Sequence, residues 1–144
     1  MANQLFPTVA IPSLTKTKKN VDYRYKRSAA WDPATGDFIR DGAGKIVEHS
    51  GRDAYMIWCM KTSLTERYAK LAYPHSIGSE LEDAKHEQSP SAVELALERT
   101  LTEAIMVNPR TEYVRDFAFL WRGENLKVTF KVKGYDLEEF QIEL

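Results

Sequence analysis

Residues 91–133, SAVELALERTLTEAIMVNPRTEYVRDFAFLWRGENLKVTFKVK, decide the fold of this chain, because a helical repeat changes there into alternating strands. Ser91 and Glu94 have the spacing of a helix-capping box. Apolar side chains then recur at every fourth position, which is typical of an amphipathic helix. Pro109 disfavours helical geometry at Asn108, so we expect the helix to end by about residue 107. Arg110 is then presented at a fixed corner between helix and sheet. The apolar positions are Val93, Leu97, Leu101 and Ile105.

The C-terminal third of the chain predicts a three-stranded antiparallel meander. Gly123 and Gly134 mark the turns, and apolar residues alternate with polar ones between and beyond them. In the first strand, we expect the large side chains Tyr113, Arg115, Phe117, Phe119 and Trp121 to share one face. The inward residues of the later strands are Leu126, Val128, Phe130, Val132, Phe140, Ile142 and Leu144.

The N-terminal half has weaker patterns. Residues 21–27 alternate and predict a short strand, and residues 32–36 have turn chemistry ahead of a second strand at Phe38 and Ile39. A helical spacing runs from Gly51 to Tyr68, with a break allowed at Thr62 or Ser63, and a short acidic helix is expected over residues 79–85. The fold class is therefore α+β, with an N-terminal hairpin, helices, and one long capped helix packed on the C-terminal antiparallel β-meander.

Length and composition favour one domain. The chain has 144 residues, of which 43% are hydrophobic, and we expect an extended arm over residues 1–20 and a single domain over residues 21–144. No apolar run approaches the roughly 20 residues of a membrane span, and no signal peptide is evident. We therefore expect neither a membrane protein nor one secreted through a signal peptide. Cys59 is the only cysteine, and we interpret it as a buried thiol rather than a nucleophile.

Charge is spread unevenly along the chain. Residues 1–30 contain six basic residues and one acidic residue, whereas residues 78–105 contain seven acidic residues and two basic ones. A basic arm that includes Lys16, Lys18 and Lys19 can contact nucleic acid, but no aromatic residues are interleaved with these lysines. The alternative is that oppositely charged faces fit neighbouring subunits, and we expect this arm to meet an acidic neighbour.

No residue pattern indicates an active site. His49, His75 and His86 lack the spacing of a metal site, and residues 41–45, DGAGK, do not match a phosphate-binding loop. Carboxylates are numerous enough to allow a glycosidase-like pair, but none lies in an apolar setting that would raise its pKa. We therefore expect no catalytic residues, no metal and no cofactor.

The last strand is expected at the edge of the meander. An open strand edge offers unpaired N–H and C=O groups to which a partner can add a strand. Glu139 and Glu143 can instead guard the edge, and both interpretations stay open here. The segment that would receive a partner strand consists of Leu137, Glu138, Glu139, Phe140, Gln141 and Ile142.

The order of motifs resembles the XkdS-like baseplate proteins of PBSX-type prophages, which belong with the sheath-initiator wedge proteins of contractile tails. The resemblance runs from about Tyr23 to the end of the chain. Its markers are Trp31-Asp32, Gly36-Asp37-Phe38, Asp41-Gly42, Gly51, Ala54, Trp58, Lys61, Thr65-Glu66-Arg67, Tyr73, Gly78, the capped helix, Asn108-Pro109-Arg110 and the meander.

This resemblance implies a structural, non-catalytic role in the baseplate of a contractile phage tail or a phage-tail-like particle. Relatives carry a Glu-Pro-Arg motif that contacts the core bundle of the larger wedge proteins. The matching residues here are Asn108, Pro109 and Arg110, so one charge is lost, although asparagine can still form hydrogen bonds. The C-terminal sheet of the family receives strands from the first sheath ring.

The resemblance also implies the partners and the location. The partners would be wedge and sheath proteins, with tube or hub proteins as further candidates, and neither nucleic acid nor a membrane. The particle would assemble in the bacterial cytoplasm, and the chain would reside in the baseplate. Two alternatives are a lysozyme-like enzyme that degrades peptidoglycan, since some relatives carry that label, and a free-standing protein-binding module.

Overall fold

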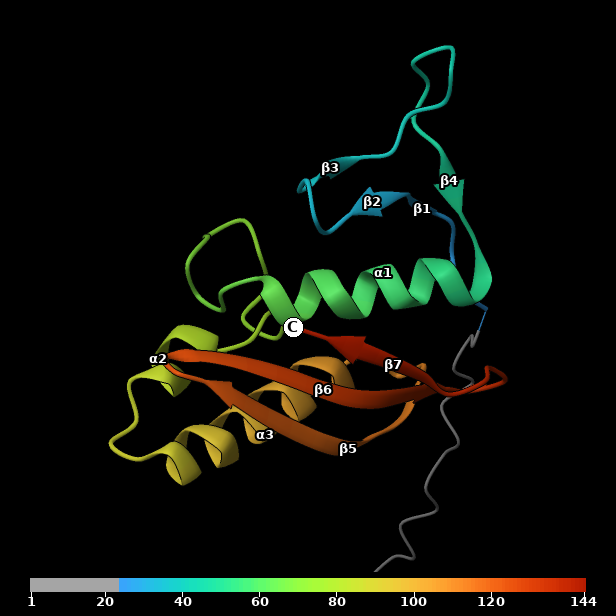
Figure 1. Ribbon diagram of the computed structural model, residues 1–144. Coiled ribbons are helices and arrows are strands. Elements are labelled where there is room, and N and C mark those ends of the chain that lie inside the picture. The colour runs from blue at the N-terminus through green and yellow to red at the C-terminus, as the bar shows by residue number, and fades with distance from the viewer. Residues whose placement is uncertain (1–23) are drawn as a thin grey trace, which may run out of the picture.

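The computed structural model describes residues 24–144, and it shows an α+β fold (Figure 1). The helices are α1 (Gly51–Leu64), α2 (Leu81–Lys85) and α3 (Pro90–Met106). The long strands β5 (Thr111–Arg122) and β6 (Asn125–Gly134) and the short β7 (Phe140–Glu143) form the expected antiparallel meander, with β6 in the middle. Four two-residue strands precede α1, namely β1 (Ser28–Ala29), β2 (Trp31–Asp32), β3 (Asp37–Phe38) and β4 (Glu48–His49).

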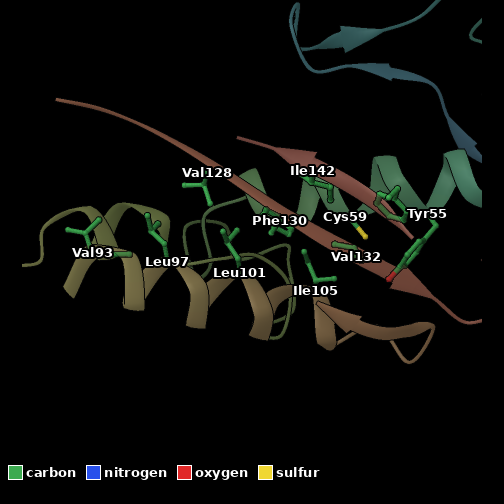
Figure 2. Packing of buried hydrophobic residues seen from close by; sticks show 12 residues of the cluster. Tyr55, Cys59, Val93, Leu97, Leu101, Ile105, Val128, Phe130, Val132 and Ile142 are labelled. Carbon is green, nitrogen blue, oxygen red and sulfur yellow. The ribbon is translucent and has the colours of Figure 1, made fainter. Parts of the chain in front are cut away.

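The hydrophobic core lies between the helices and one face of the meander (Figure 2). The apolar stripe of α3 is fully buried, as the sequence predicts: Leu101 and Ile105 have 0% of their surface exposed, and Val93 and Leu97 are also buried. They face Val128, Phe130 and Val132 of β6, while Tyr55 and Cys59 of α1 close the core from the side. Each such aliphatic side chain contributes about 1.5–3 kcal/mol through its burial, which holds helix and sheet together.

The N-terminus of α3 differs from the expected capping box. The N-cap is Ser89, whose Oγ accepts a hydrogen bond from the Ala92 N–H at 3.3 Å, and not Ser91. Pro90 occupies the first helical turn, where its fixed φ fits and its missing N–H costs nothing. Glu94 instead accepts a hydrogen bond from Trp121 Nε1 at 2.8 Å. The helix ends at Met106, close to the predicted boundary.

A β-bulge in β5 overturns the expectation that its five large side chains share one face. Two residues, Asp116 and Phe117, lie opposite one residue of β6, and Asp116 has a positive φ of 57°. Because one extra residue reverses the alternation, Tyr113 and Arg115 point to the outer face, whereas Phe117 and Phe119 pack against the core. The meander thus has an apolar inner face and a charged outer face.

The N-terminal hairpin is confirmed, but its first strand was misplaced. β2 and β3 pair Trp31 with Phe38 across the predicted turn. Residues 24–27 form no strand, so the prediction for residues 21–27 is wrong over its described part. The reason is that Tyr25 is used in tertiary contacts, where its Oη donates a hydrogen bond to the Tyr135 carbonyl at 2.7 Å.

Helix α1 is one continuous helix that ends at Leu64, so Thr65 and Tyr68 lie outside it, contrary to the prediction. The hydroxyl of Thr65 donates to the Lys61 carbonyl, and Thr65 adopts an extended conformation that ends the helix. The chain then forms a loop whose base is closed by Arg67, which donates to the Gly78 carbonyl and pairs with Glu80. The short acidic helix α2 follows, as predicted.

Candidate partner-binding site

The predicted Asn108-Pro109-Arg110 corner lies in the turn between α3 and β5. Asn108 Oδ1 accepts the N–H of Arg110 at 3.0 Å, and the Asn108 carbonyl accepts the N–H of Thr111 at 2.9 Å. The asparagine side chain therefore has a role inside the turn. It fixes the backbone from which Arg110 projects.

Arg110 connects Arg24 and Tyr25 to this corner through hydrogen bonds. Its Nε donates to the Arg24 carbonyl at 2.9 Å, and its own carbonyl accepts the Tyr135 N–H at 3.0 Å and the Tyr25 hydroxyl at 3.4 Å. The two terminal amino groups of the guanidinium have no partner within residues 24–144. These groups can receive a carboxylate in the two-pronged geometry that suits arginine.

Two tyrosines make the corner rigid. The Tyr55 hydroxyl and Thr111 Oγ1 are 2.7 Å apart, and Thr111 Oγ1 donates to the Ile105 carbonyl at the end of α3. The rings of Tyr25 and Tyr55 lie 5.1 Å apart. Burial raises the pKa of both hydroxyls, so they stay protonated and able to donate at neutral pH.

A hollow of about 270 Å³ opens beside this corner, and we call it the basic hollow. Among residues 24–144, three cationic side chains and no carboxylate line it, together with three aromatic rings. An acidic side chain that enters this hollow would meet three cations, of which Arg27 also has an exposed ion pair with Glu48. The lining consists of Tyr25, Lys26, Arg27, Ser28, Ala54, Tyr55, Trp58, Asn108 and Arg110.

The second predicted site is the edge of the meander, and only part of the predicted segment lies in the observed edge strand. Phe140, Gln141 and Ile142 lie in β7, whereas Leu137, Glu138 and Glu139 precede the strand. β7 pairs only with β6, so it is an edge within residues 24–144, as predicted, and β5 forms the opposite edge. Phe140 and Ile142 are buried and hold β7 on the core.

The hydrogen-bond pattern between β6 and β7 determines which backbone N–H and C=O groups of β7 point away from β6. Leu144 and Val128 exchange two hydrogen bonds of 2.9 Å each, and antiparallel pairs alternate between bonded and non-bonded residues. Counting back from Leu144, the pairs at Ile142 and Phe140 bond to β6, whereas Gln141 and Glu143 direct their N–H and C=O groups away from it. A partner strand would meet these two residues.

Both predicted guards of the edge have cationic partners. Glu139 accepts hydrogen bonds from the Tyr113 hydroxyl at 2.9 Å and from Arg115 Nη2 at 2.8 Å, and these bonds lower the pKa of its carboxyl group. Glu143 lies 2.6 Å from Lys127 Nζ. Both carboxylates therefore bind cations of the outer face of the meander.

The structure brings the two predicted sites to one end of the meander, because the Arg110 carbonyl bonds to Tyr135 in the turn between β6 and β7. The predicted arm residues Lys16, Lys18 and Lys19 lie outside the described residues. Our sequence reasoning missed Tyr25, Tyr55 and Trp58 as parts of the corner. The cluster of cations at residues 24–27 was visible in the charge pattern, but only the structure shows that it faces Arg110.

Other features of the described chain bear on chemistry. Cys59 is completely buried, and burial raises the pKa of its thiol to about 12, which agrees with an unreactive structural cysteine. Within residues 24–144, no group of three or more His, Cys, Asp or Glu side chains is arranged to hold a metal ion. None of the helices in this range is long and apolar enough to cross a membrane.

Comparison with known proteins gives a relative and a family for this chain. The chain is 34% identical over 71 residues to the phage-like element PBSX protein XkdS of Bacillus subtilis (strain 168). The match includes 48% of this chain, and it spans only half the length of that relative. Residues 27–136 match the family model of the contractile injection system sheath initiator, which is well over half of the chain. The chain belongs to the family of contractile injection system sheath initiators.

Proposed function

We propose that this protein joins the wedge core of a contractile-tail baseplate to the first ring of sheath and starts sheath assembly there. Membership of the sheath-initiator family supports the broader role, which is a structural, sheath-related part of a phage tail or tail particle. In this proposal the wedge contact is at the Arg110 corner and the sheath contact is at β7. Baseplate assembly takes place in the bacterial cytoplasm.

The open edge of β7 is the observation that carries the sheath contact. Gln141 and Glu143 present backbone donors and acceptors on a strand that Phe140 and Ile142 fix to the core. A sheath strand that pairs there gains main-chain hydrogen bonds in a fixed register. The first ring then sits in one defined orientation on the baseplate.

The wedge contact rests on the geometry of Arg110. Its Nε is bound to the Arg24 carbonyl, so the guanidinium plane is oriented before a partner arrives. Arg110 lines the basic hollow together with Lys26 and Arg27, and an acidic wedge surface complements all three cations. The arm residues Lys16, Lys18 and Lys19 would add contacts with an acidic tube, hub or wedge subunit.

Two substitutions of one residue test the sheath contact. Gln141→Pro removes an N–H on the open side of β7 and leaves the ladder to β6 intact, so sheath should not polymerise on baseplates that contain it. Gln141→Ala changes the side chain but keeps the N–H, so sheath should grow normally. Sheath length is measured by electron microscopy of particles assembled with each variant.

Circular dichroism and thermal unfolding must first show that both variants fold. Normal sheath on Gln141→Pro baseplates would eliminate β7 as the docking edge and leave β5 as the candidate.

No feature of residues 24–144 favours the lysozyme-like alternative. A turbidity assay on peptidoglycan would reveal such an activity directly.

A further inference from the structure

A second hollow lies farther along α1, and nothing above gives it a function. It has a volume of about 500 Å³ and lies between the hairpin of β2 and β3, the C-terminal half of α1 and the loop after α1. Trp31, Phe38, Trp58 and Tyr73 contribute aromatic rings, and Lys61 is the only charged residue among its described lining. We call it the aromatic hollow.

The aromatic hollow and the basic hollow share Trp58. Residues 25–38 run alongside α1 in Figure 1, so the two hollows follow one another along the seam between this segment and the helix. Ala54, Trp58 and Lys61 recur at helical spacing on this side of α1. We call the two hollows together the α1 seam.

In the part of the chain that the structure describes, four cations and no carboxylate line the α1 seam: Lys26, Arg27, Lys61 and Arg110. Arg27 has an exposed ion pair with Glu48, but Lys61 has no carboxylate partner within residues 24–144. Lys61 is instead held over two rings, with its Nζ 5.6 Å from the centre of Trp31 and 5.1 Å from that of Phe38. Positive charge therefore lines the seam, and contacts hold the Lys61 and Arg110 side chains in place.

Apolar surface accompanies the charge. Phe38, Leu64 and Tyr73 line the aromatic hollow and are 42%, 50% and 52% exposed. Large side chains that remain this exposed mark a contact surface when they gather around a concave site. The loop that carries Tyr73 is anchored at its base by Arg67, which donates to the Gly78 carbonyl.

We propose that the α1 seam binds one acidic segment of a partner protein, whose carboxylates face the four cations and whose apolar side chains enter the aromatic hollow. A single-stranded nucleic acid fits less well, because it requires open ring faces on which bases can stack. Here Lys61 lies over one face of Trp31 and one face of Phe38, and Trp58 is stacked with Tyr55 at 6.2 Å, so these faces are not open to bases. At the Arg110 end this proposal rests on the wedge contact proposed above, and at the Lys61 end it stands alone.

The three tryptophans provide the test. Trp31 and Trp58 lie in the seam, whereas Trp121 bonds to Glu94 near the far end of the meander. The full chain, labelled with ¹⁵N, is titrated with a 16-residue amphipathic peptide that carries glutamates on one face and leucines on the other. The indole N–H signals of Trp31 and Trp58 should shift to saturation, and that of Trp121 should stay in place.

Two control peptides test separately whether binding needs the negative charges and the apolar side chains of the peptide. Replacing the glutamates by lysines should abolish the shifts, and replacing the leucines by serines should weaken them. Binding should also weaken as salt rises, because the contact is partly ionic. Equal binding of the lysine peptide, equal shifts at Trp121, or tighter binding of a single-stranded oligonucleotide would overturn the proposal.

Variants locate the contact. Lys61→Gln should weaken binding about two- to fivefold, whereas Lys127→Gln on the outer face of the meander should not change it. Lys61→Arg keeps the cation over the rings and should retain binding, which separates loss of charge from loosening of the hairpin. Unchanged affinity in Lys61→Gln would exclude the aromatic hollow.

A failure of the seam proposal can be distinguished from a failure of the wedge contact. If Arg110→Ala prevents incorporation into baseplates while the acidic peptide never shifts Trp31, the wedge contact stands and the seam proposal fails. If the peptide binds at Trp31 and Trp58 while Arg110→Ala is incorporated normally, the seam binds acidic segments and the wedge contact fails.

Discussion

Gly134 occupies a position where the chain has no room for a side chain. A Cβ added there would collide with the Tyr25 hydroxyl and would lie 3.1 Å from Tyr55 Cε1 and 3.2 Å from Leu137 Cδ1. We expect Gly134→Ala to lower the free energy of unfolding by about 1–3 kcal/mol, because a fixed tyrosine pair must move. Urea denaturation measures the change.

Gly42→Ala is the matched control for this prediction. Gly42 lies in the turn between β3 and β4, has no positive φ, and would place its new Cβ more than 4 Å from any neighbour. Its stability should be close to that of the unchanged protein. Similar losses in both variants would show that a general effect of glycine replacement, rather than the Tyr25 contact, is responsible.

The elements differ in how well the sequence predicts them. The stripe from Val93 to Ile105 and the alternation from Leu126 to Val132 were predicted correctly, because each follows one period over its whole length. The face of β5 could not be predicted, since the bulge at Asp116 adds one residue without an obvious turn signal. At a bulge the alternation of inward and outward side chains is interrupted, and only the pairing of β5 with β6 shows where this happens.

The same limit applies to the candidate site. Asn108, Pro109 and Arg110 were predicted at a corner because Pro109 stops a helix, and that reasoning is local. Tyr25 and Tyr135 join the corner from positions 85 and more than 20 residues away in the sequence. Contacts of that kind carry no local pattern, so the basic hollow emerged only from the fold.

The start of α3 gives a prediction at the scale of one element. Ser89→Ala should destabilise the protein by about 0.5–2 kcal/mol, since the Ala92 N–H loses its acceptor. Ser91→Ala should have little effect, because Ser91 lies inside the helix and is exposed. Thermal unfolding of both variants checks this order. A larger loss for Ser91→Ala would restore the capping box that the sequence suggested.

At the scale of the whole molecule, the two proposed contacts lie at one end of the meander but depend on different atoms. The Arg110 side chain binds the Arg24 carbonyl, whereas its backbone carbonyl holds Tyr135. Arg110→Ala therefore removes the free guanidinium groups and keeps the turn that leads toward β7. The open groups of Gln141 depend only on the ladder between β6 and β7. The contacts can thus be separated by substitution.

This separation predicts an order of assembly. Arg110→Ala should be missing from purified baseplates, whereas Gln141→Pro should be present on baseplates that lack sheath. The double variant should behave as Arg110→Ala does, because a subunit that never joins the wedge cannot fail at the later sheath step. Quantitative mass spectrometry of purified particles measures incorporation, and Arg99→Ala, which removes an exposed cation of α3, serves as the control. Sheath on baseplates that lack this protein would contradict a role for the chain as the link between wedge and sheath, and incorporation of the double variant would contradict the wedge contact at Arg110.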